Sequence, residues 1–179
     1  MSSSGGRGGG AELQQVSSED PYDASSYHVQ AVIDHALVAK IRITDGPPFV
    51  FNEWAVDPCP LPAHPHVVSL SRAVVKAEWR KFSLYKILLV EALIHLAAKN
   101  PARTVVSAVE PDFPLLPFLL ELGIEKKGNP IHFLDPPHPA RLGQCIMTEP
   151  SRHMELYNGF KKELISLLIA HNLRPIYST

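Results

Sequence analysis

Cysteine is scarce in this sequence, with only Cys59 and Cys145 among 179 residues, and the two form no CxxC pair. Free thiols in a reducing cytoplasm are the simplest interpretation, because disulfide frameworks need more cysteines. A signal peptide is not expected, since no charged segment followed by an apolar stretch opens the chain. We therefore predict a cytoplasmic protein.

Long apolar runs and an excess of one charge are also lacking. No run approaches the roughly 20 apolar residues that a membrane span requires, so no span is predicted. The formal net charge of −1 at pH 7 gives no case for nucleic-acid binding. The length of 179 residues suits one domain with a hydrophobic core of its own.

Glycine and serine dominate only the first segment, MSSSGGRGGG, which cannot bury enough apolar surface to become ordered. We expect residues 1–18 to form a disordered tail and residues 19–179 to form a single domain. No internal repeat or second shift in composition marks a further boundary.

The rest of the chain shows alternating strand and helix patterns. Residues 27–33 and 36–43 flank Asp34-His35 and predict an antiparallel hairpin, which a Pro-rich loop follows. The other expected elements are a strand at 67–75, a buried helix from an N-cap at Ser83 to about Asn100, a strand at 104–109 that is covered on both faces, a short helix at 114–122 closed by Gly123, two edge strands at 131–134 and 142–148, and an amphipathic helix at 151–171. A strand, helix and strand in this order predict a right-handed parallel crossover within an otherwise mixed sheet. The predicted fold class is α/β.

Basic residues cluster where strand 67–75 leads into the long helix. Lys76, Arg80, Lys81 and Lys86 surround the start of this helix. The first N–H groups of a helix lack partners within it and carry the positive end of its dipole, so they can bind an anion. Because helix starts normally favour acidic residues, the cluster indicates an anionic ligand, with a solvated basic turn as the alternative.

The same segment resembles the core of the GNAT acyltransferase superfamily. The resemblance rests on the strand, on RKFSLY at 80–85, on the apolar helix and next strand, and on a short helix ending in ELGIEKKG. In that superfamily a Q/R-x-x-G-x-G/A loop holds the pyrophosphate or phosphopantetheine of the acyl donor. Arg80 matches its first position, whereas Ser83 and Tyr85 replace its two small residues. The resemblance implies a mixed, mostly antiparallel sheet with splayed central strands and flanking helices.

A narrower resemblance, over residues 19–148, is to the acyl-homoserine-lactone (autoinducer) synthases of quorum sensing and the N-acyl amino acid synthases. It rests on EDPYDASSYHVQAV, LVAKIRI, SLSRAVV and ELGIEKKGNPIHF. By position, Asp20 and Asp23 match the acidic pair of that family, Arg42 its first arginine, and Ser71-Arg72 its E-x-S-R-x-x-V strand.

Two departures from the family pattern affect the expected chemistry. Ser69 stands where the family has a glutamate often invoked as general base, and a hydroxyl does not accept a proton as a carboxylate does. The family also has an N-terminal helix that helps to close the amine pocket, whereas this chain offers a short polar segment there.

The resemblance implies an N-acyltransferase that moves a fatty acyl group from an acyl-carrier-protein or CoA thioester to an amine, such as an amino acid or S-adenosylmethionine. The thioester is a co-substrate, and neither a bound cofactor nor a metal is expected. The expected catalytic residues are Asp20, Asp23, Arg42, Ser69 and Arg72. Residues 74–76 (Val74, Val75, Lys76) and Arg80, Lys81, Ser83, Leu84 and Lys86 are expected to bind the acyl donor, and Val106, Ser107 and Glu110 the acceptor substrate.

Alternatives accompany these assignments. The basic cluster would steer an acidic carrier protein, but CoA also carries phosphates, so the sequence does not separate the two donors. A catalytically inactive module that binds an acyl carrier, a lipid or a protein partner is the second interpretation, and Ser69 favours it. An acetyltransferase acting on a small amine is the third. Arg72 could instead form a structural ion pair, and the Asp20/Asp23 pair an Asx-turn.

Overall fold

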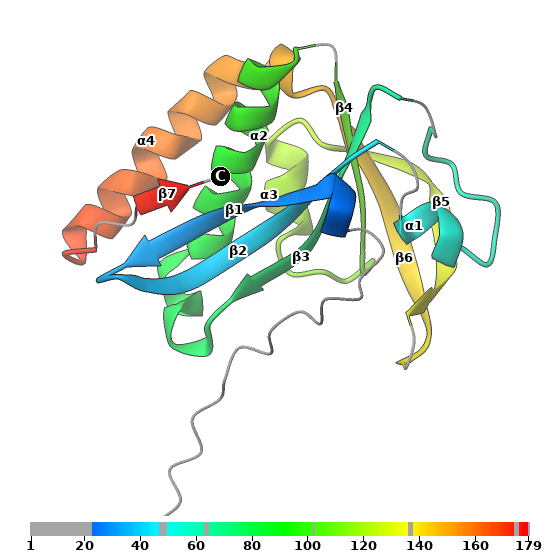
Figure 1. Cartoon of the computed structure of the whole chain (residues 1–179), viewed down its shortest axis with the longest axis horizontal. Coiled ribbons are helices and arrows are strands. Elements are labelled where there is room, and N and C mark those ends of the chain that lie inside the picture. Colours follow the sequence, from blue (N-terminus) through cyan, green and yellow to red (C-terminus); the bar gives the residue numbers. More distant parts are fainter. Residues whose placement is uncertain are drawn as a thin grey trace, which may run out of the picture.

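The structure of the protein is a computed structural model that describes residues 23–46, 50–62, 65–101, 103–135, 138–173 and 176–178. The tail predicted at 1–18 and Asp20 lie outside these residues. The described residues form a seven-stranded sheet with the order β5-β6-β4-β3-β2-β1-β7 (Figure 1). The strands are β1 (Ser26–Ile33), β2 (Ala36–Asp45), β3 (Val67–Val75), β4 (Thr104–Val109), β5 (Glu125–Asp135), β6 (His138–Thr148) and β7 (Ile176–Ser178).

The sheet is mixed and mostly antiparallel, as predicted. Among the described pairs, β3 and β4 are parallel and the remaining neighbours are antiparallel. The β1–β2 hairpin turns at Asp34 and His35, whose φ angles of 49° and 63° suit the twist of a two-residue hairpin loop. The connection from β3 to β4 runs through α2 (Leu84–Lys99), which confirms the predicted parallel crossover.

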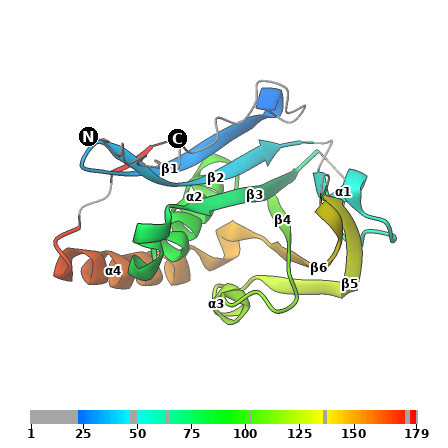
Figure 2. The same ribbon diagram turned by 90° about the horizontal axis from the view of Figure 1, so that it is seen from below.

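Two apolar cores cover opposite faces of the sheet. On one face lie α2, α3 (Leu116–Glu121) and α4 (Met154–Ala170), and Figure 2 shows α2 and α4 together beneath β1, β2 and β3. On the other face Phe51 of α1 (Val50–Trp54) packs on the second core. Ile146 belongs to the first core and its neighbour Cys145 to the second, because adjacent strand residues face opposite ways. The expectation that β4 is covered on both faces is confirmed, because Val105 belongs to the first core and Val106 to the second.

Three short 3-10 helices, η1 (Asp23–Ser25), η2 (Ala77–Phe82) and η3 (Pro150–His153), complete the elements of the described ranges. Within those ranges no helix is both long and apolar enough to cross a membrane.

The start of α2 differs from the prediction. The helix does not follow β3 directly, because η2 lies between them, and Ser83 joins η2 to α2 with a left-handed φ of 57°. Ser83 occupies the N-cap position of α2, as predicted, but its hydroxyl makes no capping hydrogen bond. A left-handed residue turns the chain between two helical axes, and this geometry differs from the extended conformation in which a serine caps a helix.

The edge assignments also need correction. The strand expected at 142–148 is internal, because β6 pairs with both β4 and β5. The strand expected at 131–134 begins at Glu125 instead, and its pairing with β6 is irregular between Lys127 and Ile131. The first half of β5 contains charged residues, Gly128 and Pro130, which an edge strand tolerates but which do not form a recognisable strand pattern in the sequence. Two elements were not predicted at all: α1, in the expected Pro-rich loop, and β7.

Candidate active site at a gap between two strands

The two central strands separate after a short stretch of pairing. β3 and β4 pair from Val67↔Thr104 to Ser69↔Val106, and the pairing ends there although β3 continues to Val75 and β4 to Val109. At the point of separation the Ser107 hydroxyl donates a hydrogen bond of 2.7 Å to the Leu70 carbonyl oxygen. The predicted splay of the central strands is therefore present.

A β-bulge in β3 borders the gap. Lys40 of β2 lies opposite Val74, whereas Arg42 lies opposite Ser71, so β3 contributes one residue more than β2 over this stretch. Arg72, within the bulge, has a left-handed φ of 48°. Bulges bend a strand and disrupt its ladder, and a left-handed non-glycine residue stores strain of a kind found at functional sites.

Two cavities border the gap, one on each face of the sheet. The first has a volume of about 300 Å³ and lies on the side of α2 and α3, and the second has a volume of about 540 Å³ and lies on the side of α1. Both cavities are lined by residues 70–73 of β3, by residues 107–109 of β4 and by Glu110, which follows β4. A molecule that crosses the gap could therefore reach both faces of the sheet.

The first cavity is lined mainly by apolar side chains. Its walls include Ile41, Leu89, Phe113, Leu119, Ile124 and Ile146. Tyr85 also lines it and packs edge-on against Phe113, with ring centroids 5.8 Å apart. Burial raises the pKa of Tyr85 to about 12, so its hydroxyl stays neutral at physiological pH. This lining suits an uncharged, apolar group.

The second cavity combines basic, hydroxyl and aromatic side chains. Arg42 is only 1% exposed, and its Nε donates a hydrogen bond of 3.1 Å to the Ser71 hydroxyl. Ser69 is also buried, while Arg141 forms an exposed ion pair with Glu110 at 3.4 Å. Glu110 is the one carboxylate among the described residues that line the two cavities. The aromatic lining comes from Phe51, Trp54 and Phe133.

The predicted site residues fall into two groups. Arg42, Ser69, Arg72, Ser107 and Glu110 all line the second cavity, Val106 lines the first, and Arg72, Ser107 and Glu110 line both. Arg72 is exposed rather than buried. Asp20 lies outside the described residues, as does the side chain of Asp23.

The residues predicted to bind the donor line neither of these cavities. The Arg80 Nε donates to the Val75 carbonyl oxygen at 3.2 Å, and the Lys86 Nζ lies 4.8 Å from the centre of the Phe118 ring. Lys76, Lys81 and Ser83 lie in the same stretch that leads into α2, and Val74 is exposed on β3. Leu84 is fully buried in the first core, so its predicted contact with a donor would involve its main chain rather than its side chain.

Sequence reasoning missed Arg141 and Phe113. The sequence PPHPARLG at 136–143 predicts a loop whose chemistry requires no ligand, and only the pairing of β6 with β4 brings Arg141 beside Glu110. Phe113 follows β4 in a turn, where no periodicity marks it. No group of three or more His, Cys, Asp or Glu side chains in the described ranges is arranged to hold a metal ion.

No family model matches the sequence, and neither does any curated protein. Solved structures do resemble it. They include BjaI, a CoA-dependent acyl-homoserine lactone synthase solved with SAM and isopentyl-CoA, with a TM-score of 0.61, 18% identity, and coverage of 80% of this chain and 68% of that one. A second CoA-dependent acyl-homoserine lactone synthase, MesI, has a TM-score of 0.55 and 19% identity over 78% of this chain and 72% of its own.

An acetyltransferase of the GNAT family from Streptococcus pneumoniae has a TM-score of 0.50 and 14% identity over 70% of this chain and 67% of its own. At these identities the likeness shows the fold: the chain has a GNAT-like fold that resembles the autoinducer synthases.

Proposed function

We propose that the protein is an N-acyltransferase that moves an acyl group from a thioester to an amine, in the manner of an autoinducer synthase. The observation that carries this proposal is the gap between β3 and β4, with a mainly apolar cavity on one face and, on the other, a cavity that also carries Arg42, Arg141 and Ser69. The apolar cavity suits the acyl chain of a thioester. The cavity on the other face would let a polar acceptor approach the thioester carbonyl at the gap.

The acyl chain would occupy the first cavity, between Leu89, Phe113 and Leu119. The amide groups of the pantetheine arm would hydrogen-bond to the main chain of β3 and β4 beyond Ser69↔Val106, as an added strand does. The basic stretch from Lys76 to Lys86 would then attract the phosphates of the donor. The neighbours that are named CoA-dependent support CoA as the carrier, and an acyl carrier protein is the other donor to test.

The amine would approach from the second cavity. Its ammonium group would pair with Glu110 and lose a proton before the nitrogen attacks the thioester carbonyl. The attack forms a tetrahedral oxyanion, which needs nearby N–H donors. Ala73 lies in the bulge, where two residues of β3 face the single residue Ile41, so we assign the oxyanion to its main-chain amide. Collapse of the intermediate forms the amide and expels the carrier thiolate, which takes up the second proton that the nitrogen loses, while the first passes from Glu110 to solvent.

A second candidate function is a catalytically inactive module that binds an acyl thioester. Ser69 favours it, because a buried hydroxyl does not accept a proton as the glutamate expected there from the family resemblance would. The exposed Glu110, already paired with Arg141, would then bind the ligand without turning it over.

The experiment is thiol release from a panel of acyl-CoA and acyl-carrier-protein thioesters, with amino acids and S-adenosylmethionine as acceptors. Mass spectrometry of the organic extract would identify the N-acyl product. We expect Arg72→Ala to abolish product formation with unchanged folding, because the exposed Arg72 side chain lines both cavities and would bind the carboxylate of the acceptor. Arg152→Ala is the matched control, since Arg152 is 72% exposed and pairs with Glu149 away from both cavities.

A variant that fills the gap tests the geometry itself. Ala73 lines both cavities, so Ala73→Phe should block transfer, whereas Ala98→Phe on the exposed end of α2 should not. Saturable binding of a thioester without turnover would establish the inactive module instead. If no member of the panel is bound and none is turned over, both functions are refuted.

A further inference from the structure

The two cysteines of the chain meet in space although they are far apart in sequence. Cys145 lies on β6 and is fully buried in the second core. Cys59 lies in the segment between α1 and β3 and packs on the same core while remaining partly exposed. The two side chains are neighbours in this core: Pro60, next to Cys59, closely approaches Gly128, and Lys127 beside that glycine pairs with Cys145. Neither residue lines the two cavities, so the proposed acyl transfer leaves this pair without a role.

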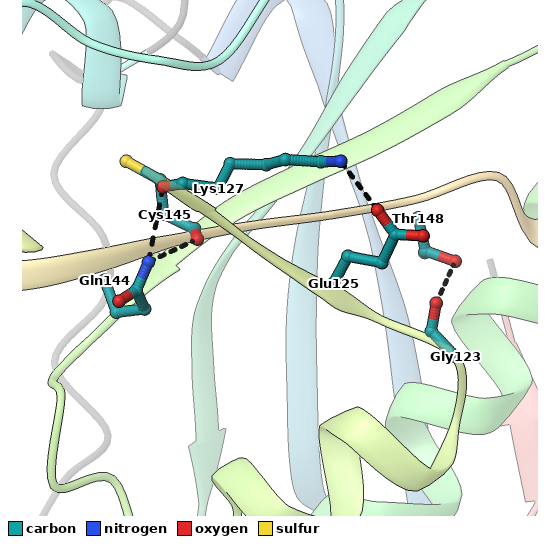
Figure 3. Close-up of polar contacts among 6 residues, drawn as sticks. All are labelled: Gly123, Glu125, Lys127, Gln144, Cys145 and Thr148. Atoms are coloured by element: carbon teal, nitrogen blue, oxygen red, sulfur yellow. Dashed lines mark hydrogen bonds and ion pairs between the residues drawn. The ribbon is translucent and has the colours of Figure 1, made fainter. Parts of the chain in front are cut away.

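The Cys145 side of the pair is held rigidly. β6 pairs with β4 on one side and with β5 on the other. The Gln144 amide donates hydrogen bonds to the carbonyl oxygens of Lys127, at 3.3 Å, and Cys145, at 3.0 Å. Figure 3 shows the Cys145 sulfur pointing away from this amide, toward the opposite face of the sheet. The strand therefore presents the sulfur in one fixed direction.

The Cys59 side is anchored on either side of the cysteine. The Val56 N–H donates to the His132 carbonyl oxygen at 2.8 Å, and the His132 N–H donates to the Asp57 carboxylate at 2.9 Å. On the other side of Cys59, Leu61 is buried in the second core. These contacts hold residues 55–61 against β5, which is the neighbour of β6, and against the second core.

The two thiols differ in how an oxidant reaches them. Burial and the neighbouring Cys59 raise the pKa of Cys145 to about 12, so the buried thiol stays protonated. It is also inaccessible, whereas Cys59 is partly open to solvent. An oxidant in solution therefore reaches Cys59 first, and Cys145 is placed to resolve the product.

We propose that Cys59 and Cys145 form a reversible intramolecular disulfide when the protein meets a peroxide. The Cys59 sulfur attacks the peroxide and becomes a sulfenic acid, which releases one water. The Cys145 sulfur then attacks this sulfur as its proton passes to the leaving hydroxyl group, so that a second water is released and the S–S bond forms. The two thiols lose two electrons and two protons, and hydrogen peroxide is reduced to two waters. This inference goes beyond the proposed acyl transfer and does not depend on it.

The disulfide would join two walls of the second cavity. The segment of Cys59 follows directly from α1, which supplies Phe51 and Trp54 to that cavity, and the strand of Cys145 supplies Arg141 and Gly143. Oxidation would tie the α1 wall to the sheet and restrict its movement. We expect slower amide hydrogen exchange over residues 50–62 in the oxidised protein than in the reduced protein.

The test uses the reduced full chain, treated with hydrogen peroxide and then denatured for thiol counting. We expect titratable thiols to fall from two to none, with a monomer on a non-reducing gel. Trypsin should yield residues 43–72 linked to residues 142–152, since lysine and arginine are absent inside both peptides before their last residue. Dithiothreitol should restore both thiols.

Two variants separate this disulfide from other oxidation. Cys59→Ser should keep its single thiol through peroxide treatment, because Cys145 is buried. Cys145→Ala should lose its single thiol to oxidation at Cys59 without a linked peptide. The proposal is overturned if the oxidised wild type retains a free Cys145, or if its disulfide joins two chains through Cys59. Unchanged exchange over residues 50–62 in a linked protein would overturn the inferred link between the cavity walls.

Discussion

Replacing Ser107 by alanine removes the hydroxyl that bridges β3 and β4 where their pairing ends. This hydroxyl donates a hydrogen bond of 2.7 Å to the Leu70 carbonyl oxygen. A typical hydrogen bond contributes about 0.5–1.5 kcal/mol net, and a carbonyl left unpaired in a dry site costs about 1–3 kcal/mol. Residues 70 and 107 both line the two cavities, so water can reach the carbonyl in the variant. We therefore expect a loss of about 1 kcal/mol in the free energy of unfolding.

Urea denaturation followed by circular dichroism measures this loss, with an unchanged m-value, and the melting temperature should fall by about 2–4 °C. Ser166→Ala is the matched control, because the Ser166 hydroxyl donates to the Lys162 carbonyl oxygen at 2.9 Å on the exposed face of α4. Alanine favours a helix there, so we expect a change within about 0.5 kcal/mol. Equal losses in the two variants would refute a bridging role for Ser107.

Three further predictions concern other parts of the fold. Gly123→Ala should destabilise the protein by more than about 1 kcal/mol in urea, because φ is +75° there and a Cβ would lie 2.6 Å from the His153 ring. A neutral result would contradict that packing, and His153→Ala should recover part of the loss. Burial and Lys99 lower the pKa of His95 in the folded protein below its usual 6.5. The contribution of neutral His95 to stability is therefore fully present above pH 6.5 and is lost as the pH falls through the folded-state pKa. His95→Gln should flatten the change in urea midpoint between about pH 7.5 and about pH 5.5, and an equally steep change would assign it to other groups. Leu119 lines the first cavity and is 2% exposed, so Leu119→Ala should lower the free energy of unfolding by about 2–5 kcal/mol. The space it opens should shift any transferase activity toward longer acyl chains. An unchanged chain preference would place the acyl group elsewhere.

The elements that sequence predicts well are those whose pattern follows from burial. β3 matches its predicted range, and the β1–β2 hairpin differs only at its outer ends, because alternating or continuous apolar residues dominate both. α2 lies within one residue of its predicted end, since nearly every face of it is buried. In such segments local preference and tertiary packing favour the same structure.

The features that sequence did not predict depend on contacts between distant segments. α1 and the first half of β5 contain prolines or charged residues near positions that pack on the sheet, so their composition suggests loops. The left-handed conformation of Arg72 follows from the extra residue in its pairing with β2, which no local pattern indicates. For the same reason Arg141 reached the site only through the pairing of β6 with β4.

The pairing of β7 with β1 has a consequence for synthesis on the ribosome. β1 pairs with β7 through Gln30↔Ser178, Ala31↔Tyr177 and Val32↔Ile176. The outer edge of β1 is therefore paired only after more than a hundred further residues have been synthesised. Until those residues emerge, the outer edge of β1 exposes main-chain groups that can pair with another nascent chain. Closure of this edge is therefore among the last steps by which the sheet becomes protected from aggregation, and it depends on a three-residue strand.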